Sequence, residues 1–511
     1  MTRRKRFRYV DRMRNVRCRV LAITVATAAG LGLAGIGCSP SHLPGLPPGS
    51  PFAEAGAPGS LFPQGVAIGD VSNQSVVLWL RTEGPARIGI EHGILSTGRD
   101  PDVQSFQPIN HQPLAYETGA DRDYTLSVLL DDLRPGTSYG FRITAVPSTQ
   151  AEDRPGSDPP SETVVGRFKT LPDPQAHGPV EFGWSADLGG QAYCRDTAAG
   201  YPIFDVARQF TMDFFLLLGD TIYADEICPA PPNAPGSNFT AATLDAYRAK
   251  HRYQRGSPAL QRFVASVPVY VVWDDHEVRN NFSGPFDEKM PVGRQALFEY
   301  WPIGRDPRDP DRLYRRLRAG STVEIFILDT RQYRSRNGDP DGPRKTMLGD
   351  AQLAWLLEGL AHSSATWKVI ASSVPLSVPK KAPLHTPGSD GWVKGDDGTG
   401  FETELKRIAD WIVSRNIRNV VWLAADVHFV QANAYDVDRD GRDDFHEFIA
   451  GPLSAAGGRM APPRSPFRMR TLVYEGGYRN FGIVRTDETS FDVKIIDEAG
   501  QARFSYHIPV Q

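Results

Sequence analysis

Five apolar segments of this chain are each followed directly by acidic residues, and two of them also by a histidine. The segments cover 180–187, 214–220, 267–276, 323–329 and 420–428. The polar residues at their ends are Asp187, Asp220, Asp274, Asp275, His276, Asp329, Asp426 and His428. A single acid in this position ordinarily caps the following helix or turn. Five segment ends with the same chemistry instead predict one shared site.

Bound cations are the simplest explanation for so many acids in one place. Carboxylates that cluster without compensation repel one another and raise one another's pKa values. Mixed carboxylate and imidazole ligands suit Fe, Mn or Zn, and oxygen-rich positions also suit Ca. The residues therefore predict a metal centre.

The surrounding pattern predicts the elements that would position this centre. After residue 172, apolar strands alternate with helical stretches over 202–212, 242–266, 350–362 and 402–415, which is typical of a layered α/β domain. Ligands in such folds bind at the carboxyl ends of the strands. We therefore expect the acids to meet in one crevice of a domain over 173–511.

The segment over 61–172 has a different period. Four stretches, over 75–81, 86–91, 124–130 and 138–144, alternate apolar and polar residues as short strands do. The run Leu133–Tyr139 resembles the tyrosine corner of a fibronectin-type or immunoglobulin-like sandwich. No cluster of His, Cys or carboxylates occurs here, so we expect a small β domain with a structural or shielding role.

The N-terminus has the pattern of an export signal. Residues 1–19 hold nine Arg or Lys, and 20–36 are uncharged and apolar, as in a signal peptide. Gly35-Ile36-Gly37-Cys38 resembles a bacterial lipobox, although Gly35 replaces the usual Leu. Lipidation of Cys38, an uncleaved anchor, and either twin-arginine or general secretion remain open. We therefore expect a signal over 1–38 and a Pro/Gly-rich linker over 39–60. Each alternative predicts that the rest of the protein lies outside the cytoplasm, in the cell envelope or secreted.

Composition excludes several other classes. The 511 residues are 40% hydrophobic and 23% charged, which argues against a disordered chain or a protein with many membrane spans. The net charge of −3 combines a basic N-terminus with an acidic body. Such a body lacks the basic footprint of a nucleic-acid binder.

Several motifs together resemble the alkaline phosphatase D (PhoD-like) family of exported metallophosphoesterases. They are Ser185–Gln191, Leu218–Glu226, Trp273–Asn281, Leu328–Arg334, Leu348–Trp355, Ala425–His428 and Ala450–Ala455, with Phe62–Asp70 in the β domain. The resemblance covers about 61–511, and Trp-Asp-Asp-His-Glu-Val with Asn-Asn is its most specific part.

The resemblance implies a four-layer α/β/β/α core with two or three metal ions, Fe and Ca being favoured and Mn or Zn being alternatives. The implied metal ligands are Asp187, Asp220, Tyr223, Asp275, Asp426 and His428, with Asp220 bridging the metals. Asp274, Glu277, Asn280 and Asn281 are expected as further ligands or supports of the ligands. Many family members carry Ser-Cys-Gln where this chain has Ser185-Ala186-Asp187, which leaves the metal identity open.

The resemblance also implies a reaction in which a metal-bound hydroxide attacks the phosphorus of a phosphate mono- or diester. His276 is a candidate general acid for the leaving group, and its alternative is a structural hydrogen bond to a ligand carboxylate. Arg331 could hold two phosphate oxygens through its planar guanidinium, or it could form a salt bridge to a nearby acid. The roles of Asp329 and Tyr333 stay open.

Two further features lie outside this set. Asp436, Asp438, Asp440 and Glu447 match positions 1, 3, 5 and 12 of a Ca²⁺ loop, although an acidic, solvated hairpin is the alternative. Cys194 and Cys228 follow Asp187 and Asp220 by seven and eight residues. They could form a disulfide in an oxidising compartment; two free thiols, or Cys194 as a ligand, are the alternatives.

The function predicted from the sequence is an exported, metal-dependent phosphoesterase that acts on a small substrate. We expect a monomer without a stable nucleic-acid partner, and contact with the membrane only through the N-terminal signal or a lipid. A phospholipase-type or nuclease-type phosphodiesterase is the alternative within the enzyme class. An inactive cell-surface binding protein on the same fold is the alternative outside it.

Overall fold

The computed structural model of the chain describes residues 59–95, 106–109, 112–148, 161–379 and 388–511. The predicted signal peptide over 1–38, the lipidation site Cys38 and nearly all of the predicted linker over 39–60 lie outside these residues. In the described part of the chain, no helix has the length and apolar character needed to cross a membrane.

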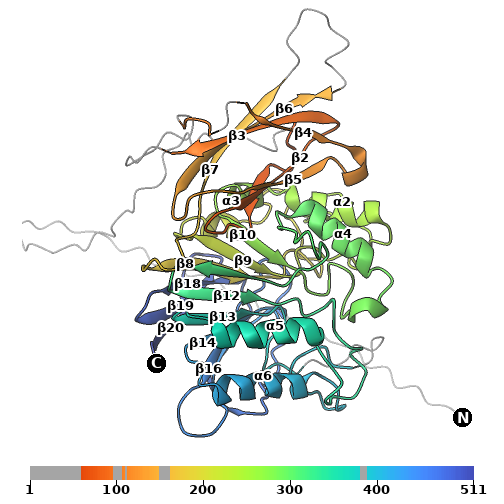
Figure 1. The fold of residues 1–511 in the computed structure, drawn as a ribbon. Helices are drawn as coiled ribbons and strands as arrows, with labels where there is room; N and C mark the ends of the chain where they lie inside the picture. The colour runs from red at the N-terminus through yellow and green to blue at the C-terminus, as the bar shows by residue number, and fades with distance from the viewer. Residues whose placement is uncertain (1–58, 96–105, 110–111, 149–160, 380–387) are drawn as a thin grey trace, which may run out of the picture. The chain divides into compact units, whose positions relative to one another are not determined.

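The strands of the described residues form three sheets (Figure 1). The first sheet has the order β20-β19-β18-β8-β9-β10-β1-β2-β5. Its strands are β1 Val66–Gly69, β2 Val76–Arg81, β5 Thr125–Leu130, β8 Val180–Ser185, β9 Phe214–Leu218, β10 Val269–Val272, β18 Asn480–Thr486, β19 Ser490–Asp497 and β20 Ala502–Pro509.

The second sheet has the order β11-β12-β13-β14-β16-β15-β17 and the third the order β4-β3-β6-β7. The second sheet contains β11 Arg315–Ala319, β12 Val323–Ile327, β13 Trp367–Ala371, β14 Val420–Ala424, β15 Val430–Asp436, β16 Phe445–Ile449 and β17 Arg468–Glu475. The third contains β3 Ala86–Ile94, β4 Leu114–Thr118, β6 Ser138–Pro147 and β7 Glu162–Lys169.

Helices cover the outer faces of the two large sheets. They are α1 Ile203–Ala207, α2 Leu244–Arg255, α3 Pro258–Val264, α4 Met290–Tyr300, α5 Gly349–His362 and α6 Glu402–Ser414, with 3₁₀ turns at Ala120–Arg122 and Gly284–Phe286. α3 packs on β1, while residues of α5 and α6 share a core with the second sheet. Figure 1 shows α5 and α6 on the far side of that sheet from β8 and β9.

The two large sheets face each other across one apolar core. Ile325 and Val369 of the second sheet belong to this core, whereas their neighbours Phe326 and Ile370 pack with α5 and α6. The indole Nε1 of Trp184 on β8 donates to the main-chain oxygen of Ala424 on β14 at 3.2 Å. The strands are apolar along their length because both of their faces are covered. The predicted four-layer α/β/β/α class is confirmed.

Two predicted helices differ from the structure, and local sequence explains the first difference. The helical stretch predicted over 242–266 is divided into α2 and α3 by Gly256, Ser257 and Pro258. Proline disfavours helical geometry at the residue before it but fits the first turn of a new helix. The helix predicted over 202–212 is limited to the five residues of α1.

The N-terminal β segment shares a sheet with the rest of the described chain. β1 pairs in parallel with β10, where Gly69 lies opposite Val269. β2 and β5 extend the same sheet, and β3, β4, β6 and β7 form the sheet that packs on it to complete the sandwich. The Tyr139 hydroxyl accepts a hydrogen bond from the main-chain nitrogen of Arg134 at 2.8 Å, as in a tyrosine corner.

Candidate metal centre

Three neighbouring parallel strands bring the acidic ends of the first sheet together. β8 pairs with β9 and β9 with β10, all in parallel, so their carboxyl ends lie at the same edge. Asp187, Asp220 and Asp275 follow these ends directly. Asp426 and His428 follow β14 of the facing sheet.

Ligand-type atoms from these residues form two adjoining groups. One group contains Asp187, Asp220 and His428, and the other contains Asp220, Asp275 and His276; within each group the atoms lie within 4.8 Å of one another. A third group joins Asp274, Asp275 and Asp426. Asp220 belongs to both of the first two groups, as a carboxylate that bridges two cations would.

The backbone at the centre adopts left-handed geometry that residues other than glycine rarely use. The φ angles are +64° at Asp187, +51° at Asp220, +72° at Asp426 and +58° at His428. Such angles persist only where the surrounding structure fixes them, and they are concentrated at functional sites. Each of these four residues belongs to at least one of the three groups of ligand-type atoms.

Asp187 provides the clearest test of whether a cation fits here. Its side chain is fully buried, and neither carboxylate oxygen accepts a hydrogen bond from any residue that the structure describes. A buried carboxylate without a partner is strongly unfavourable. His428 Nε2 lies 3.5 Å from Asp187 Oδ1 and 3.0 Å from the Tyr223 hydroxyl. The donor set of carboxylate, imidazole and phenol suits a metal ion.

The orientation of His428 also favours a ligand role. Its Nδ1 lies 2.6 Å from the main-chain oxygen of Ala456, which can only accept a hydrogen bond. Nδ1 therefore carries a hydrogen, and Nε2 is the ring nitrogen that faces Tyr223 and Asp187. A hydrogen bond of this kind from the second nitrogen fixes the ring of a metal-ligating histidine.

Crowding of acids shifts the pKa values of the centre in one direction. Burial and then the charge of Asp275 raise the pKa of Asp220 well above its ordinary value. Burial and then the charge of Asp220 raise the pKa of the Tyr223 phenol well above its ordinary value. Both shifts reflect negative charge confined away from water, and a bound cation would reverse them.

Glu277 supports the centre from behind and is not free to act as an additional ligand. Its Oε1 accepts from the main-chain nitrogen and hydroxyl of Thr221, at 2.6 and 2.8 Å. Its Oε2 accepts from the main-chain nitrogens of Asp220 and Asp274, at 3.1 and 2.9 Å. Glu277 thus joins the loops after β9 and β10, and burial raises its pKa to about 7.

The two asparagines have different positions. Asn281 is buried, and with its amide nitrogen turned toward the acids it donates to Asp275 at 3.0 Å and to Asp390 at 2.9 Å. Asn280 is exposed, and its main-chain nitrogen donates to Asp225 at 2.8 Å. Asn281 therefore holds a candidate ligand, whereas only the backbone of Asn280 contributes here.

Arg331 is not placed to bind phosphate. It is fully buried, with Nε 2.7 Å from Asp274 Oδ1 and Nη2 3.0 Å from Asp390 Oδ2. The structure therefore supports the salt-bridge alternative and corrects the assignment of Arg331 as a catalytic residue. The same contacts occupy Asp274, which also accepts from the Ser373 hydroxyl at 2.7 Å. Asp274 therefore holds neighbouring loops together through Arg331 and Ser373, besides belonging to a group of ligand-type atoms.

Asp329 is likewise structural. Its Oδ1 accepts from the indole of Trp273 at 2.8 Å and from the main-chain nitrogens of Arg331 and Gln332, each at 3.0 Å. These are the contacts of an acid that caps a turn after a strand. One of the five acidic strand ends therefore caps the turn that follows it, which is the ordinary role of a single acid in this position.

His276 has a carboxylate partner that the sequence analysis did not identify. Its Nδ1 lies 2.7 Å from Asp225 Oδ1, and its ring stacks on Tyr223 with centroids 4.2 Å apart. Burial lowers the pKa of His276, but the charges of Asp275, Asp220 and Asp225 hold it well above its ordinary value. Asp225 lies inside the motif Leu218–Glu226, but its spacing alone did not connect it with His276.

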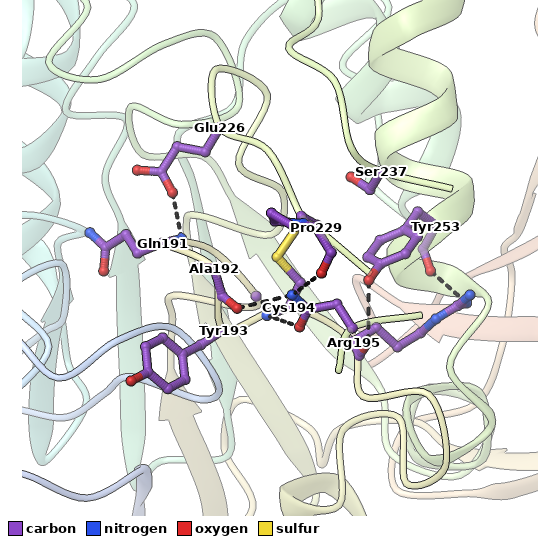
Figure 2. The surroundings of a disulfide bond; sticks show 12 residues. Gln191, Ala192, Tyr193, Cys194, Arg195, Glu226, Pro229, Ser237 and Tyr253 are labelled. Carbon is purple, nitrogen blue, oxygen red and sulfur yellow. Dashed lines mark hydrogen bonds between the residues drawn. A yellow bond between two sulfur atoms is a disulfide. The ribbon is translucent and has the colours of Figure 1, made fainter. Parts of the chain in front are cut away.

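The loops next to the centre are joined by a disulfide between Cys194 and Cys228, whose Cα atoms lie 5.9 Å apart (Figure 2). The side chain of Asn233 supports it by accepting from the main-chain nitrogen of Cys194 at 3.0 Å. The Asn233 amide donates to the main-chain oxygens of Ala192 and Pro229. This is the cysteine pair that the sequence suggested, and it removes the alternative of Cys194 as a ligand.

The acidic hairpin between β15 and β16 differs from the Ca²⁺ loop suggested by the sequence. Ligand-type atoms of Asp436, Asp438 and Asp444 lie within 4.8 Å of one another. Glu447 is fully buried on β16 and accepts from the hydroxyl of Tyr435 at 2.6 Å. Glu447 therefore belongs to the core and cannot be the twelfth-position ligand. Calcium at this hairpin stays a prediction.

Solved structures identify the class to which this fold belongs. A structure described as PhoD aligns with a TM-score of 0.68 and 23% identity, over 88% of this chain and 90% of that one. A purple acid phosphatase from seeds of yellow lupin (Lupinus luteus) aligns with a TM-score of 0.58 and 12% identity, over 88% and 75%. The fold is that of the metallophosphoesterases.

Sequence comparisons identify the family. The model of the PhoD-like phosphatase matches residues 182–489, and that of the PhoD-like phosphatase N-terminal domain matches 50–172. Alkaline phosphatase D of Bacillus subtilis (strain 168) is 28% identical over 456 residues, which is 79% of this chain and 71% of that protein. The chain belongs to the PhoD-like phosphatase family and is a phosphoesterase hydrolase.

Proposed function

We propose that this protein is an exported, metal-dependent phosphoesterase that hydrolyses small phosphate mono- or diesters at the centre around Asp220. The observation that carries the proposal is the buried carboxylate of Asp187, which accepts no hydrogen bond within the described residues and faces His428 Nε2 at 3.5 Å. Asp187, Asp220, Tyr223, Asp275, Asp426 and His428 would hold two or three metal ions.

Metal ions in such a centre lower the pKa of a water molecule and neutralise the charge of the phosphate oxygens. The protein's own groups do the remaining work. Asp220 and Asp275 place their carboxylates from the ends of the adjoining strands β9 and β10. Glu277 joins the loops that follow these two strands. His276, oriented by Asp225, would donate a proton from Nε2 to the departing oxygen.

Substitution of Asp220 tests this proposal. We expect Asp220→Asn to abolish turnover of an aryl phosphate and to lower the metal content of the purified protein. The reason is that a carboxylate offers two oxygens that share a negative charge, whereas an amide is neutral and offers only one oxygen. Atomic emission analysis and a nitrophenyl phosphate assay measure the two effects. Asp245→Asn, whose side chain is 90% exposed, is the matched control. Full activity of Asp220→Asn with unchanged metal content would remove Asp220 from the centre.

Export is part of the same proposal. The disulfide between Cys194 and Cys228 supports it, because disulfides persist in oxidising compartments outside the cytoplasm. Mass spectrometry of the cell envelope should find a mature chain that lacks its first residues, beginning at a lipid-modified Cys38 if the lipobox is used. A mature N-terminus elsewhere without lipid mass would exclude lipidation but leave export standing.

A further inference from the structure

A buried arginine outside the metal centre lacks the partners that such a group requires. Arg255, the last residue of α2, is fully buried. Its Cζ lies 4.2 Å from the ring centroid of Trp79 and 5.1 Å from that of Trp301. Its Nε, Nη1 and Nη2 make no hydrogen bond within the described residues. Stacking on aromatic faces partly stabilises the charge but accepts none of these N–H groups in a conventional hydrogen bond.

Two neighbouring side chains have the same deficit. His251, one turn earlier on α2, is fully buried and stacks on Tyr300 with centroids 5.2 Å apart. Neither of its ring nitrogens has a partner among the described residues, and the same holds for Nε1 of Trp301. Burial and then the charge of Arg255 lower the pKa of His251 to about 3, so this ring stays neutral.

The chemistry of these unpartnered atoms is one-sided. A guanidinium offers five N–H donors and an indole one, while a neutral imidazole offers one donor and one acceptor. Among the interactions that the structure records, no carboxylate contacts Arg255 to balance its charge. A buried cation of this kind is costly unless an opposite charge accompanies it. A ligand that only accepts hydrogen bonds and carries negative charge meets both needs.

We propose that Arg255, with Trp301 Nε1 and His251, binds a small monovalent inorganic anion such as a halide. The anion would accept hydrogen bonds from α2 and from the residue that follows α4. It would thereby stabilise the junction of these helices with Trp79 on β2. Ordered water is the competing occupant, because water also satisfies buried polar groups. The buried Oε1 of Gln261 also accepts no hydrogen bond from the described part of the chain, and water could use it as an acceptor.

Equilibrium unfolding of the metal-loaded protein tests the proposal. Urea unfolding is measured at one ionic strength, with sodium bromide progressively replaced by sodium isethionate, a bulky organic sulfonate. An anion bound only by the folded state makes unfolding less favourable as its concentration rises. Above the dissociation constant, we expect each tenfold rise in free bromide to lower the unfolding equilibrium constant about tenfold. Crystals grown in bromide should show an anomalous peak beside Arg255.

Matched variants assign the effect to Arg255. Arg255→Gln should lose the bromide dependence, since it removes the charge. Arg248→Gln, on the same helix, should keep it, because Arg248 is paired with Glu299 at 2.7 Å. A wild-type unfolding constant that does not change with bromide, together with no anomalous peak, would overturn the anion and leave water as the occupant. Equal bromide dependence in Arg255→Gln would also overturn the proposal, because the anion would then bind elsewhere.

Discussion

The imidazole of His276 is held between an aromatic ring and a carboxylate. Tyr223 stacks on one face, and Asp225 Oδ1 lies 2.7 Å from Nδ1. An ionised carboxylate only accepts, so Nδ1 carries a hydrogen and Nε2 is the atom left to exchange a proton with a substrate. In the proposed reaction Asp225 would act through His276, as a positioning residue.

We expect His276→Ala to impair esters with poor leaving groups far more than esters with good ones. A general acid typically contributes 10²–10⁴-fold when the departing alkoxide is basic, whereas a nitrophenolate leaves without help. The measurement is kcat/KM for alkyl and nitrophenyl phosphates, together with metal content. Asp225→Asn should show the same selectivity with a smaller loss. Equal losses on both esters with metals retained would indicate phosphate binding instead, and loss of metal would make His276 a ligand or the support of one.

At the scale of elements, a buried salt bridge joins the loop after β12 to the loop after β10. Arg331 contacts Asp274 and Asp390, and all three side chains are at most 1% exposed. We expect Arg331→Ala to lower the free energy of unfolding by about 3–5 kcal/mol, because it leaves buried carboxylates without their partner. Urea unfolding measures this loss.

The control for this prediction is Arg262→Ala. Arg262 pairs with Asp205 at 2.7 Å, but both side chains are more than 40% exposed, and such pairs contribute about 1 kcal/mol or less. A stable Arg331→Ala protein whose only defect is a raised KM would indicate that Arg331 contacts the substrate.

The disulfide between Cys194 and Cys228 is a second link between elements, because it joins the loops that follow β8 and β9. Cys194 and Cys228 are 34 residues apart in sequence, and closing a loop of that length stabilises a fold by about 3–4 kcal/mol in the chain-entropy model. We expect reduction, or the double variant Cys194→Ser with Cys228→Ser, to lower the free energy of unfolding by about this amount. Peptide mapping without reductant checks the pairing. Two thiols that alkylate readily in the native exported protein would contradict it.

At the scale of the whole molecule, two buried histidines should make the fold sensitive to acid. Burial lowers the pKa of His446 to about 4 and that of His251 to about 3, from an ordinary 6.5. Between pH 6.5 and about 4 the unfolded chain therefore binds protons that the folded chain does not. The folded state loses about 1.4 kcal/mol per pH unit for each histidine as the pH falls through this window.

Urea unfolding between pH 7 and pH 4 measures this loss of stability. The variant His446→Gln should show a shallower fall over the window, because one of the two groups is gone. An unchanged slope in this variant would mean that His446 has the same pKa in the folded and the unfolded state. Carboxylates also titrate here, so the difference between the two proteins, rather than either slope alone, tests the prediction.

The sequence by itself determined much of the architecture, and it predicted acids and histidines that the structure brings close together. Period-two alternation identified β2, β3, β5 and β6, and apolar runs ending in acids identified β8, β9, β10, β12 and β14. These signals are local, because a strand covered on one or both faces must show that burial in its own residues. Resemblance to a family then supplied roles that the pattern of residues did not assign, such as Tyr223 as a ligand beside Asp220.

Only the tertiary structure decided what each polar residue contacts. Arg331 and Glu277 have the residue types of a substrate clamp and a ligand, yet both contact neighbours from other loops. Nε and Nη2 of Arg331 contact Asp274 and Asp390, and both oxygens of Glu277 accept hydrogen bonds. Asp225 meets His276 although 51 positions separate them. The pairing of β1 with β10 and the unpartnered Arg255 also depend on segments far apart in the chain. Hydrogen bonds and charge pairs act over a few ångströms, and the sequence does not state which distant residues fall within that range.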